Sequence, residues 1–148
     1  MAAIFASLEA LGTFCRDAFA AAGADAATAE AATAAMLHGT RFGVDSHGVR
    51  LLDHYVRALE GGRLNRAPAL RLTRTAGAVA MLDADDAQGA LAACRAMDGA
   101  MEIAREMGVG AVGITAARIS APQAPMPCGP RRPGTSALPS AIPTASSA

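Results

Sequence analysis

Apolar residues in the first part of the chain recur every three or four positions, which is the spacing of amphipathic helices. This pattern predicts helices over residues 7–23, 25–41 and 45–62. Ser7 and Asp25 are suitable N-caps for the first two helices, and Asp45 or Ser46 can cap the third. Glycine follows the apolar pattern in each case, as expected where a helix ends.

After Pro68 the apolar residues no longer recur at helical spacing but alternate with polar ones, as in a strand. The expected elements are strands over residues 70–73 and 78–82, a helix over 87–107 and a strand over 109–114. Asp85 or Asp86 can cap this fourth helix, and Gly108 can end it. The chain is therefore predicted to be an α/β protein in which three helices are followed by a β-hairpin, a helix and a strand.

The composition changes sharply near residue 116. Of the eight prolines only Pro68 precedes this point, and the segment 116–148 contains no acidic residue. A segment rich in Pro, Ser and Ala cannot easily build a packed element, so we expect a disordered tail. The expected organisation is a helical segment over residues 1–66, the start of an α/β domain over 67–115, and the tail over 116–148.

The overall charge excludes several classes of partner. Hydrophobic residues make up 52% of the chain and charged residues 18%, and the formal net charge is zero. No basic field is present to attract nucleic acid, and nothing in the charge favours a membrane surface. We see neither a run of transmembrane length nor a signal-peptide pattern. The three cysteines are odd in number and far apart, which argues against a disulfide framework and against a zinc knuckle, so we expect a protein of the reducing cytoplasm.

Two apparent motifs have simpler interpretations. Residues 108–113 match the letters of the dinucleotide-binding glycine motif, but that motif must follow a strand and open a helix. Here the helix comes first, so a helix end followed by a tightly packed strand is the better interpretation. His38, His47 and His54 lack the spacing of a helical chelate, and no acidic or cysteine cluster completes a ligand set, so we expect no metal site.

The most unusual stretch is Gly-Val-Asp-Ser-His-Gly-Val-Arg over residues 43–50. Ser46 can hydrogen-bond the ring of His47, and Arg50 lies one helical turn further on. A helix N-terminus and a nearby cation both favour an anion such as a carboxylate. A histidine at a helix start is structural about as often as it is catalytic. The surrounding residues favour catalysis here, as a proton donor to the carbonyl group of an acidic substrate.

These residues resemble a known family. Arg-Phe-Gly-Val-Asp-Ser-His-Gly-Val over residues 41–49, with Gly-Gly-Arg-Leu-Asn over 61–65, is similar to the type-2 malate/L-lactate dehydrogenase family. Its members are NAD(P)-dependent oxidoreductases of 2-oxoacids and imino acids. The resemblance covers the N-terminal part only, from about Leu8 to Thr115, and includes the Gln-Gly pair at 88–89.

The resemblance implies roles for particular residues. His47 would be the catalytic proton donor and Ser46 its partner, in a relay that a distant aspartate completes in the family. The substrate-binding arginine of several members lies one residue after Arg50, where this chain has Leu51, so Arg50 is the candidate here. Tyr55 matches a position near the substrate. The resemblance also implies NAD or NADP in a fold other than the doubly wound one, a 2-oxoacid or 2-hydroxyacid substrate, and a homodimer.

The sequence departs from the family after Thr115. The family continues with a His-Phe-Gly segment and a glycine-rich helix that contribute to the cofactor site, whereas residues 116–122 read Ala-Ala-Arg-Ile-Ser-Ala-Pro. Arg118, Ile119 and Ser120 can be encoded CGC-ATT-TCG, which read from its third base gives CAT-TTC, or His-Phe. Our hypothesis is that one base was lost near Thr115 and that the tail is translated out of frame.

Two alternatives to an active oxidoreductase follow from this departure. The first is an inactive truncated fragment or pseudogene product, because most of the cofactor contacts of the family would be missing. The second is a small helical interaction module, in which residues 46–48 only cap a helix. Absorbance of NADH or NADPH in the presence of a candidate substrate discriminates the enzyme from both alternatives.

The frameshift hypothesis makes a prediction about the gene. We expect the gene of an independent isolate, sequenced across the codons for residues 114–119, to contain one additional base. The frame would then encode His-Phe-Gly after Thr115. An intact frame without any family-like alternative would contradict the hypothesis.

Overall fold

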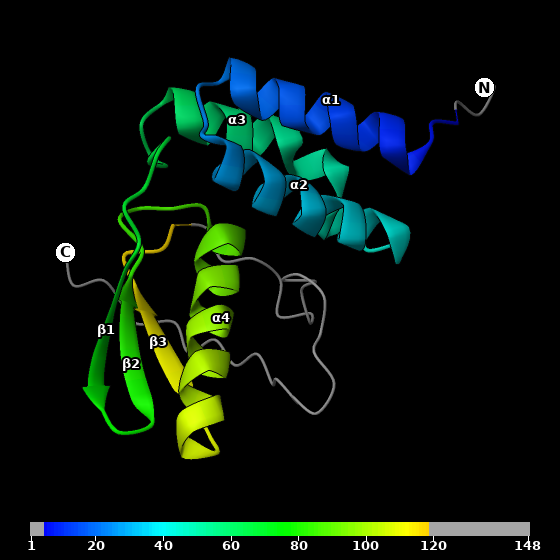
Figure 1. Ribbon diagram of the computed structural model, residues 1–148. Coiled ribbons are helices and arrows are strands. Elements are labelled where there is room, and N and C mark those ends of the chain that lie inside the picture. The colour runs from blue at the N-terminus through cyan, green and yellow to red at the C-terminus, as the bar shows by residue number, and fades with distance from the viewer. Residues whose placement is uncertain (1–4, 119–148) are drawn as a thin grey trace.

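The computed structural model describes residues 5–118, which form two layers (Figure 1). The helices of the first layer are α1 (Leu8–Ala21), α2 (Ala26–Arg41) and α3 (Leu52–Glu60). The second layer consists of β1 (Arg71–Ala76), β2 (Val79–Asp83), α4 (Gly89–Met107) and β3 (Ala111–Thr115). The predicted α/β class and the predicted order of elements are confirmed.

The first two helices begin where the sequence predicts. The Ser7 Oγ atom accepts a hydrogen bond from Ala10 N at 3.1 Å, and Asp25 Oδ1 accepts one from Thr28 N at 2.8 Å. Both caps satisfy backbone N–H groups that have no partner inside their helix.

The third helix starts later than predicted. Two short 3-10 turns precede α3, namely η1 (Asp45–His47) and η2 (Val49–Leu51). Gly48 between them is extended, with φ −92° and ψ −159°, and Val49 N donates to Thr40 Oγ1 at 2.9 Å. The prediction of one helix capped by Asp45 or Ser46 is therefore wrong, because contact with α2 overrides the local helical pattern.

The sheet joins a hairpin to a parallel crossover. Strands β1 and β2 pair antiparallel as predicted, and β2 pairs in parallel with β3, so that the order is β1-β2-β3 and β3 lies at an edge. Helix α4 connects the two parallel strands and packs on them. In Figure 1 the carboxyl ends of β2 and β3 and the N-terminus of α4 point toward the helical layer.

The cap of α4 differs from the prediction. Gln88 caps the helix, since its Oε1 atom accepts from Ala90 N at 2.6 Å. Asp85 and Asp86, the predicted caps, adopt left-handed conformations with φ 50° and 55°. The carboxylate of Asp85 instead accepts from Asn65 Nδ2 at 2.9 Å. The prediction of an aspartate cap is wrong, because these residues form the turn that leaves β2.

The main apolar core lies within the helical layer. Its largest fully buried side chains are Phe19, Met36, Leu59 and Leu64. Full burial of a side chain of this size contributes roughly 1.5–3 kcal/mol relative to its exposure. A smaller cluster of Ala84, Ala87 and Ala92 lies in the turn after β2 and the first turn of α4. The layer that carries residues 43–50 is therefore supported by most of the large buried side chains.

The ordered chain continues past residue 115. Asp86 N donates to Ala116 O at 2.8 Å, and Arg118 N donates to Ala87 O at 3.1 Å. Arg118 Nε also contacts Asp86 Oδ1 at 2.7 Å. Most of the segment predicted to be disordered, together with most of the hypothesised out-of-frame stretch, lies outside the described residues.

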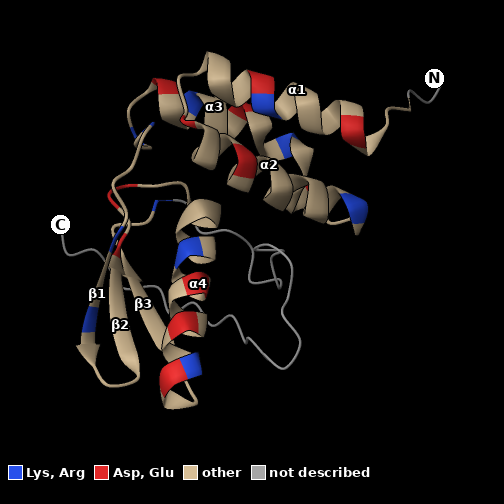
Figure 2. Ribbon diagram, viewed as in Figure 1, with Lys and Arg blue, Asp and Glu red and all other residues tan. Residues whose placement is uncertain are grey.

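Charges of both signs are distributed over α1 and α4 (Figure 2). The ion pairs Arg57–Asp53 and Arg74–Glu106 are exposed and contribute little to stability. Within residues 5–118, no helix is both long enough and apolar enough to cross a membrane.

The buried thiol of Cys15 predicts a pH dependence of stability. Burial raises the pKa of Cys15, and nearby Arg16 acts in the opposite direction. Because the pKa is higher in the folded state, the buried neutral thiol makes its full contribution to stability below the pKa of the unfolded thiol. This contribution is lost as the pH rises through the pKa of the folded state. We expect the free energy of unfolding in urea to fall as the pH rises past 9.0, the ordinary value of this group.

The Cys15→Ala variant separates this contribution from that of Tyr55, which titrates at higher pH. We expect the variant to be less stable at neutral pH, because a cavity replaces the sulfur atom. Its stability should decline less steeply above pH 9.0. Parallel declines in the parent and the variant would contradict the assignment.

Candidate active site

The turn that carries Ser46 and His47 lies against the C-terminal end of α2. Two glycines make the close approach possible. A Cβ atom at Gly39 would lie 2.5 Å from the His47 carbonyl oxygen, and a Cβ atom at Gly48 would lie 2.6 Å from Thr40 Oγ1. Any larger residue at either position would push the turn away from the helix.

Hydrogen bonds fix the turn at both of its ends. Val44 N donates to the Gly39 carbonyl at 2.9 Å before the turn, and Val49 N donates to Thr40 Oγ1 at 2.9 Å after it. Consecutive residues of α2 therefore hold the two ends. The backbone that presents His47 is positioned by a helix rather than by a free loop.

Ser46 and His47 form the hydrogen bond that the sequence predicts. The Ser46 Oγ atom lies 2.9 Å from His47 Nδ1. His47 is half-buried and Ser46 is exposed. With Nδ1 engaged, Nε2 of the ring is the nitrogen left for another partner. In the imidazolium form Nδ1–H donates to Ser46, and Nε2–H can donate a proton to a bound molecule.

Arg50 and His47 do not lie one turn apart on a single helix, as the sequence predicted. Arg50 is an exposed residue of η2, and the extended Gly48 separates it from η1. His47 therefore does not stand at the N-terminus of an α-helix, and that prediction is wrong, whereas an anion site formed with Arg50 stays a prediction. Arg50 remains an exposed cation three residues after His47 in the chain.

Tyr55 lies in the core. It is 3% exposed, and Gln88 is 1% exposed. Burial raises the pKa of Tyr55, and the side chain of Gln88 acts in the opposite direction. Sequence reasoning noted the Gln-Gly pair only as a point of resemblance. A single polar residue before a helix carries no periodic signal that would reveal its burial.

The other candidates have structural explanations. His38 packs on Phe42 with ring centroids 4.7 Å apart, and His54 is exposed. No group of three potential metal-ligating side chains occurs between residues 5 and 118. The glycine motif begins with Gly108 as the C-cap of α4, and a Cβ atom at Gly110 would clash with a carbonyl of that helix. As predicted, this motif is a helix end followed by a packed strand.

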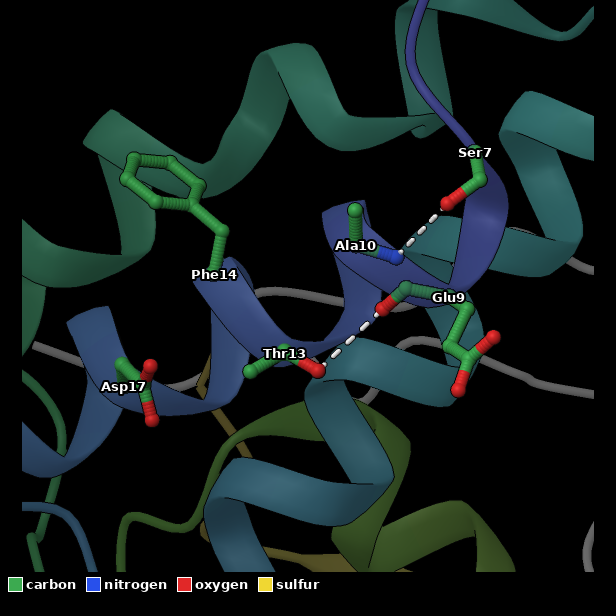
Figure 3. Close-up of a pocket in the computed structure, with 6 residues that line it drawn as sticks. All are labelled: Ser7, Glu9, Ala10, Thr13, Phe14 and Asp17. Carbon is green, nitrogen blue, oxygen red and sulfur yellow. Dashed lines mark hydrogen bonds between the residues drawn. The ribbon is translucent and has the colours of Figure 1, made fainter.

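A surface depression on α1 does not include the turn. It is lined by Ser7, Glu9, Ala10, Thr13, Phe14 and Asp17, all from α1 and its N-cap. In Figure 3 the Phe14 ring points away from Thr13 and Asp17, and the two hydrogen bonds drawn are local contacts of the helix. The depression is an open surface of one helix, with neither Ser46 nor His47 in its lining.

The structure thus combines a serine–histidine pair on a helical layer with a small α/β unit. The family model described as malate/L-lactate dehydrogenase matches residues 6–120. The chain belongs to this family.

Individual relatives agree with this assignment. Over 73 residues the chain is 38% identical to ureidoglycolate dehydrogenase (NAD(+)) of Escherichia coli K12, which covers 49% of this chain and 21% of that protein. Over 72 residues it is 36% identical to malate dehydrogenase of Pyrococcus abyssi, with 49% and 20% covered. The solved malate dehydrogenase of Pyrococcus horikoshii OT3 has a TM-score of 0.75 at 25% identity, and the match covers 80% of this chain and 34% of that one.

The matched regions are a minor part of the relatives. The chain spans about a fifth of the length of these curated proteins and about a third of the solved structure. The matches confirm the family and the fold of this region.

The close contact at Gly39 predicts the effect of adding one methyl group. Gly39→Ala is expected to destabilise the chain by about 1–3 kcal/mol, because its Cβ atom would overlap the backbone carbonyl of His47. Urea unfolding followed by circular dichroism measures the loss. Gly12→Ala in α1 is the matched control, since its nearest neighbour is the flexible end of Leu37 at 3.1 Å.

The control should be neutral or stabilising by up to about 1 kcal/mol, because alanine replaces glycine inside a helix. Equal stability of the parent and Gly39→Ala would show that the turn does not rest on α2 as described.

Proposed function

We propose that the chain carries the proton-donating part of an NAD(P)-dependent oxidoreductase that acts on a 2-oxoacid or 2-hydroxyacid. The observation that carries this proposal is the Ser46 Oγ–His47 Nδ1 contact of 2.9 Å on a turn fixed by α2. Membership of the malate/L-lactate dehydrogenase family supports the reaction class. In the reverse direction, the same histidine accepts the proton of the hydroxyl group.

The described residues can perform the proton transfer. Ser46 holds Nδ1 and so orients the ring, which leaves Nε2–H to donate to the carbonyl oxygen of the substrate. A general acid of this kind typically contributes 10²–10⁴-fold to the rate, in order of magnitude. Arg50, an exposed cation, is proposed to bind the substrate carboxylate. A contact between Tyr55 and the substrate stays a prediction.

The described residues do not fit the phosphates of a nicotinamide cofactor. The N-terminus of α4 lies at the carboxyl ends of the parallel strands, where phosphates bind in many α/β proteins. There Ala90 N already donates a hydrogen bond to Gln88 Oε1, and Gly89 and Ala90 are buried. We therefore derive no step through the cofactor. NAD or NADP is proposed because the family consists of dehydrogenases and one relative is named for NAD(+).

The wider organisation is part of the same proposal. Residues 1–66 would form the helical segment that bears the catalytic motif, and 67–115 the start of the cofactor domain. The substrate class follows from relatives named for ureidoglycolate and malate. A homodimer in the cytoplasm is the proposed state of the whole enzyme.

A second candidate is a partial enzyme without activity of its own. Two observations favour it: the chain spans about a fifth of its curated relatives, and Gln88 already engages the backbone N–H group of Ala90 that the N-terminus of α4 would offer to a phosphate. In this case the geometry of Ser46 and His47 would be retained without turnover.

Absorbance of NADH and NADPH tests both candidates. Pyruvate, oxaloacetate and a cyclic imine are the substrates to compare. If the chain is active, His47→Ala should lower kcat by roughly 10²–10⁴-fold, because the proton donor is lost. His54→Ala is the control, since His54 is exposed and lies outside the turn.

The outcomes separate the candidates. If this chain shows no turnover while a longer chain with the corrected frame is active, the partial enzyme is supported. Unchanged turnover in His47→Ala, in either chain, would contradict the assignment of His47 as proton donor.

A further inference from the structure

The linker between α3 and β1 is bonded to both layers of the structure. Leu64 is buried in the core of the helical layer, and Arg66 O accepts a hydrogen bond from Asp25 N at 2.7 Å, at the start of α2. Asn65, between these two residues, is bonded to the other layer. Its backbone N–H group donates to Asp86 O at 3.0 Å, in the turn that follows β2. The chain therefore passes from one layer to the other at Asn65.

The side chain of Asn65 adds a second bond to the same turn. Its Nδ2 group donates to Asp85 Oδ2 at 2.9 Å, and Ala69 N donates to the same oxygen atom at 2.9 Å. Asn65 Oδ1 accepts from Ala67 N at 3.1 Å, which is a local turn that fixes the amide on its own backbone. We call the bonds among Asn65, Ala69 and Asp85 the Asn65–Asp85 clasp. The clasp closes the linker on the turn after β2.

The turn adopts an unusual backbone conformation where it meets the linker. Asp85 and Asp86 have φ of 50° and 55°, a left-handed conformation that residues with a side chain rarely adopt. Asp85 N donates to Asp83 Oδ1 at 3.1 Å, which holds the turn from the side of the strand. Such conformations persist where surrounding contacts determine them, and they are concentrated at functional sites. The contacts with the linker explain why aspartates stand here in place of glycines.

The apolar cores of the two layers are separate. Among residues 5–118, the buried cluster of the helical layer draws its members from residues 15–64. The second cluster, with the apolar residues packed against it, draws its members from residues 70–114. Helix α2 also contacts α4, but a contact between two helices allows sliding and rotation. The orientation of the layers therefore needs a directional contact, and the clasp lies at the boundary between the two clusters.

We propose that Asn65 is a positioning residue for the reaction: the Asn65–Asp85 clasp sets the orientation of the layer that carries His47 relative to the carboxyl ends of β2 and β3. The proposal rests on the proposed function, in which His47 donates the proton and residues 67–115 begin the cofactor domain. Proton and hydride then come from different layers and must meet on one carbonyl group. A misplacement of about 1 Å can lower the rate of such a reaction by roughly 10²-fold.

Variants at the two ends of the clasp separate its hydrogen bonds from its charge. Asn65→Asp replaces the Nδ2 donor with a carboxylate oxygen that faces Asp85, so the bond is lost and two like charges repel. Asp85→Asn is the matched control. Both bonds of the clasp end on one oxygen, Oδ2, so an asparagine oxygen in the same place accepts both, and asparagine tolerates positive φ. Asn65→Ala removes the side chain without adding a charge, so it serves if Asn65→Asp does not fold.

Residual dipolar couplings of the backbone amides measure the orientation of the layers in the whole chain of 148 residues. In the parent and in Asp85→Asn, we expect the couplings of α2, of the Ser46–His47 turn and of β2 to fit one common alignment tensor. In Asn65→Asp, the couplings of α2 and the turn should still fit one tensor, and those of β2 and α4 another. The common orientation is then lost while each layer stays folded, a result that a role in stability alone does not produce.

One common tensor in both Asn65→Asp and Asn65→Ala would overturn the proposal, because the packing of α2 on α4 would then set the orientation. Loss of the fit within a single layer would overturn it too, since Asn65 would then support the fold and not the orientation. The couplings need neither substrate nor cofactor. A failure of this proposal can therefore be distinguished from a failure of the proposed activity, which the absorbance assays with His47→Ala test.

Discussion

The close packing of the Ser46–His47 turn on α2 is the contact on which the candidate site depends. It requires a hydrogen atom in place of a side chain at both Gly39 and Gly48, because the two backbones approach within van der Waals distance. The hydrogen bonds to Gly39 and Thr40 then fix the turn on one helix. The imidazole of His47 is held by the adjacent Ser46. The backbone of the turn is held by Gly39 and Thr40 of α2.

The turn between β2 and α4 has the complementary role of joining the layers. Asp85 binds Asn65 at the end of the helical segment, and Asp86 binds Arg118 after β3. Two consecutive non-glycine residues in this turn have positive φ, a conformation that costs about 1–3 kcal/mol each. Hydrogen bonds from Asn65 Nδ2 and Ala69 N to Asp85 Oδ2 hold the turn in this conformation.

The limits of prediction from sequence follow from the range of the interactions. The caps at Ser7 and Asp25, the hairpin and the glycine motif were predicted correctly, because each depends on residues a few positions apart. The predicted start of the third helix was wrong, because Thr40 and Gly39 act on it from another helix. The Ser46–His47 contact was predictable because the two residues are adjacent. The burial of Gln88 was not, since it depends on the packing of segments that are distant in sequence.

The position of β3 at the sheet edge bears on how the protein behaves during biosynthesis. Among the described strands, β3 pairs only with β2, so its other side offers backbone donors and acceptors to any extended segment it meets. Strand addition between nascent chains competes with folding at such an edge. For residues 5–118, pairing of the open side of β3 with an extended segment of another copy is therefore a route to association that the sheet leaves open.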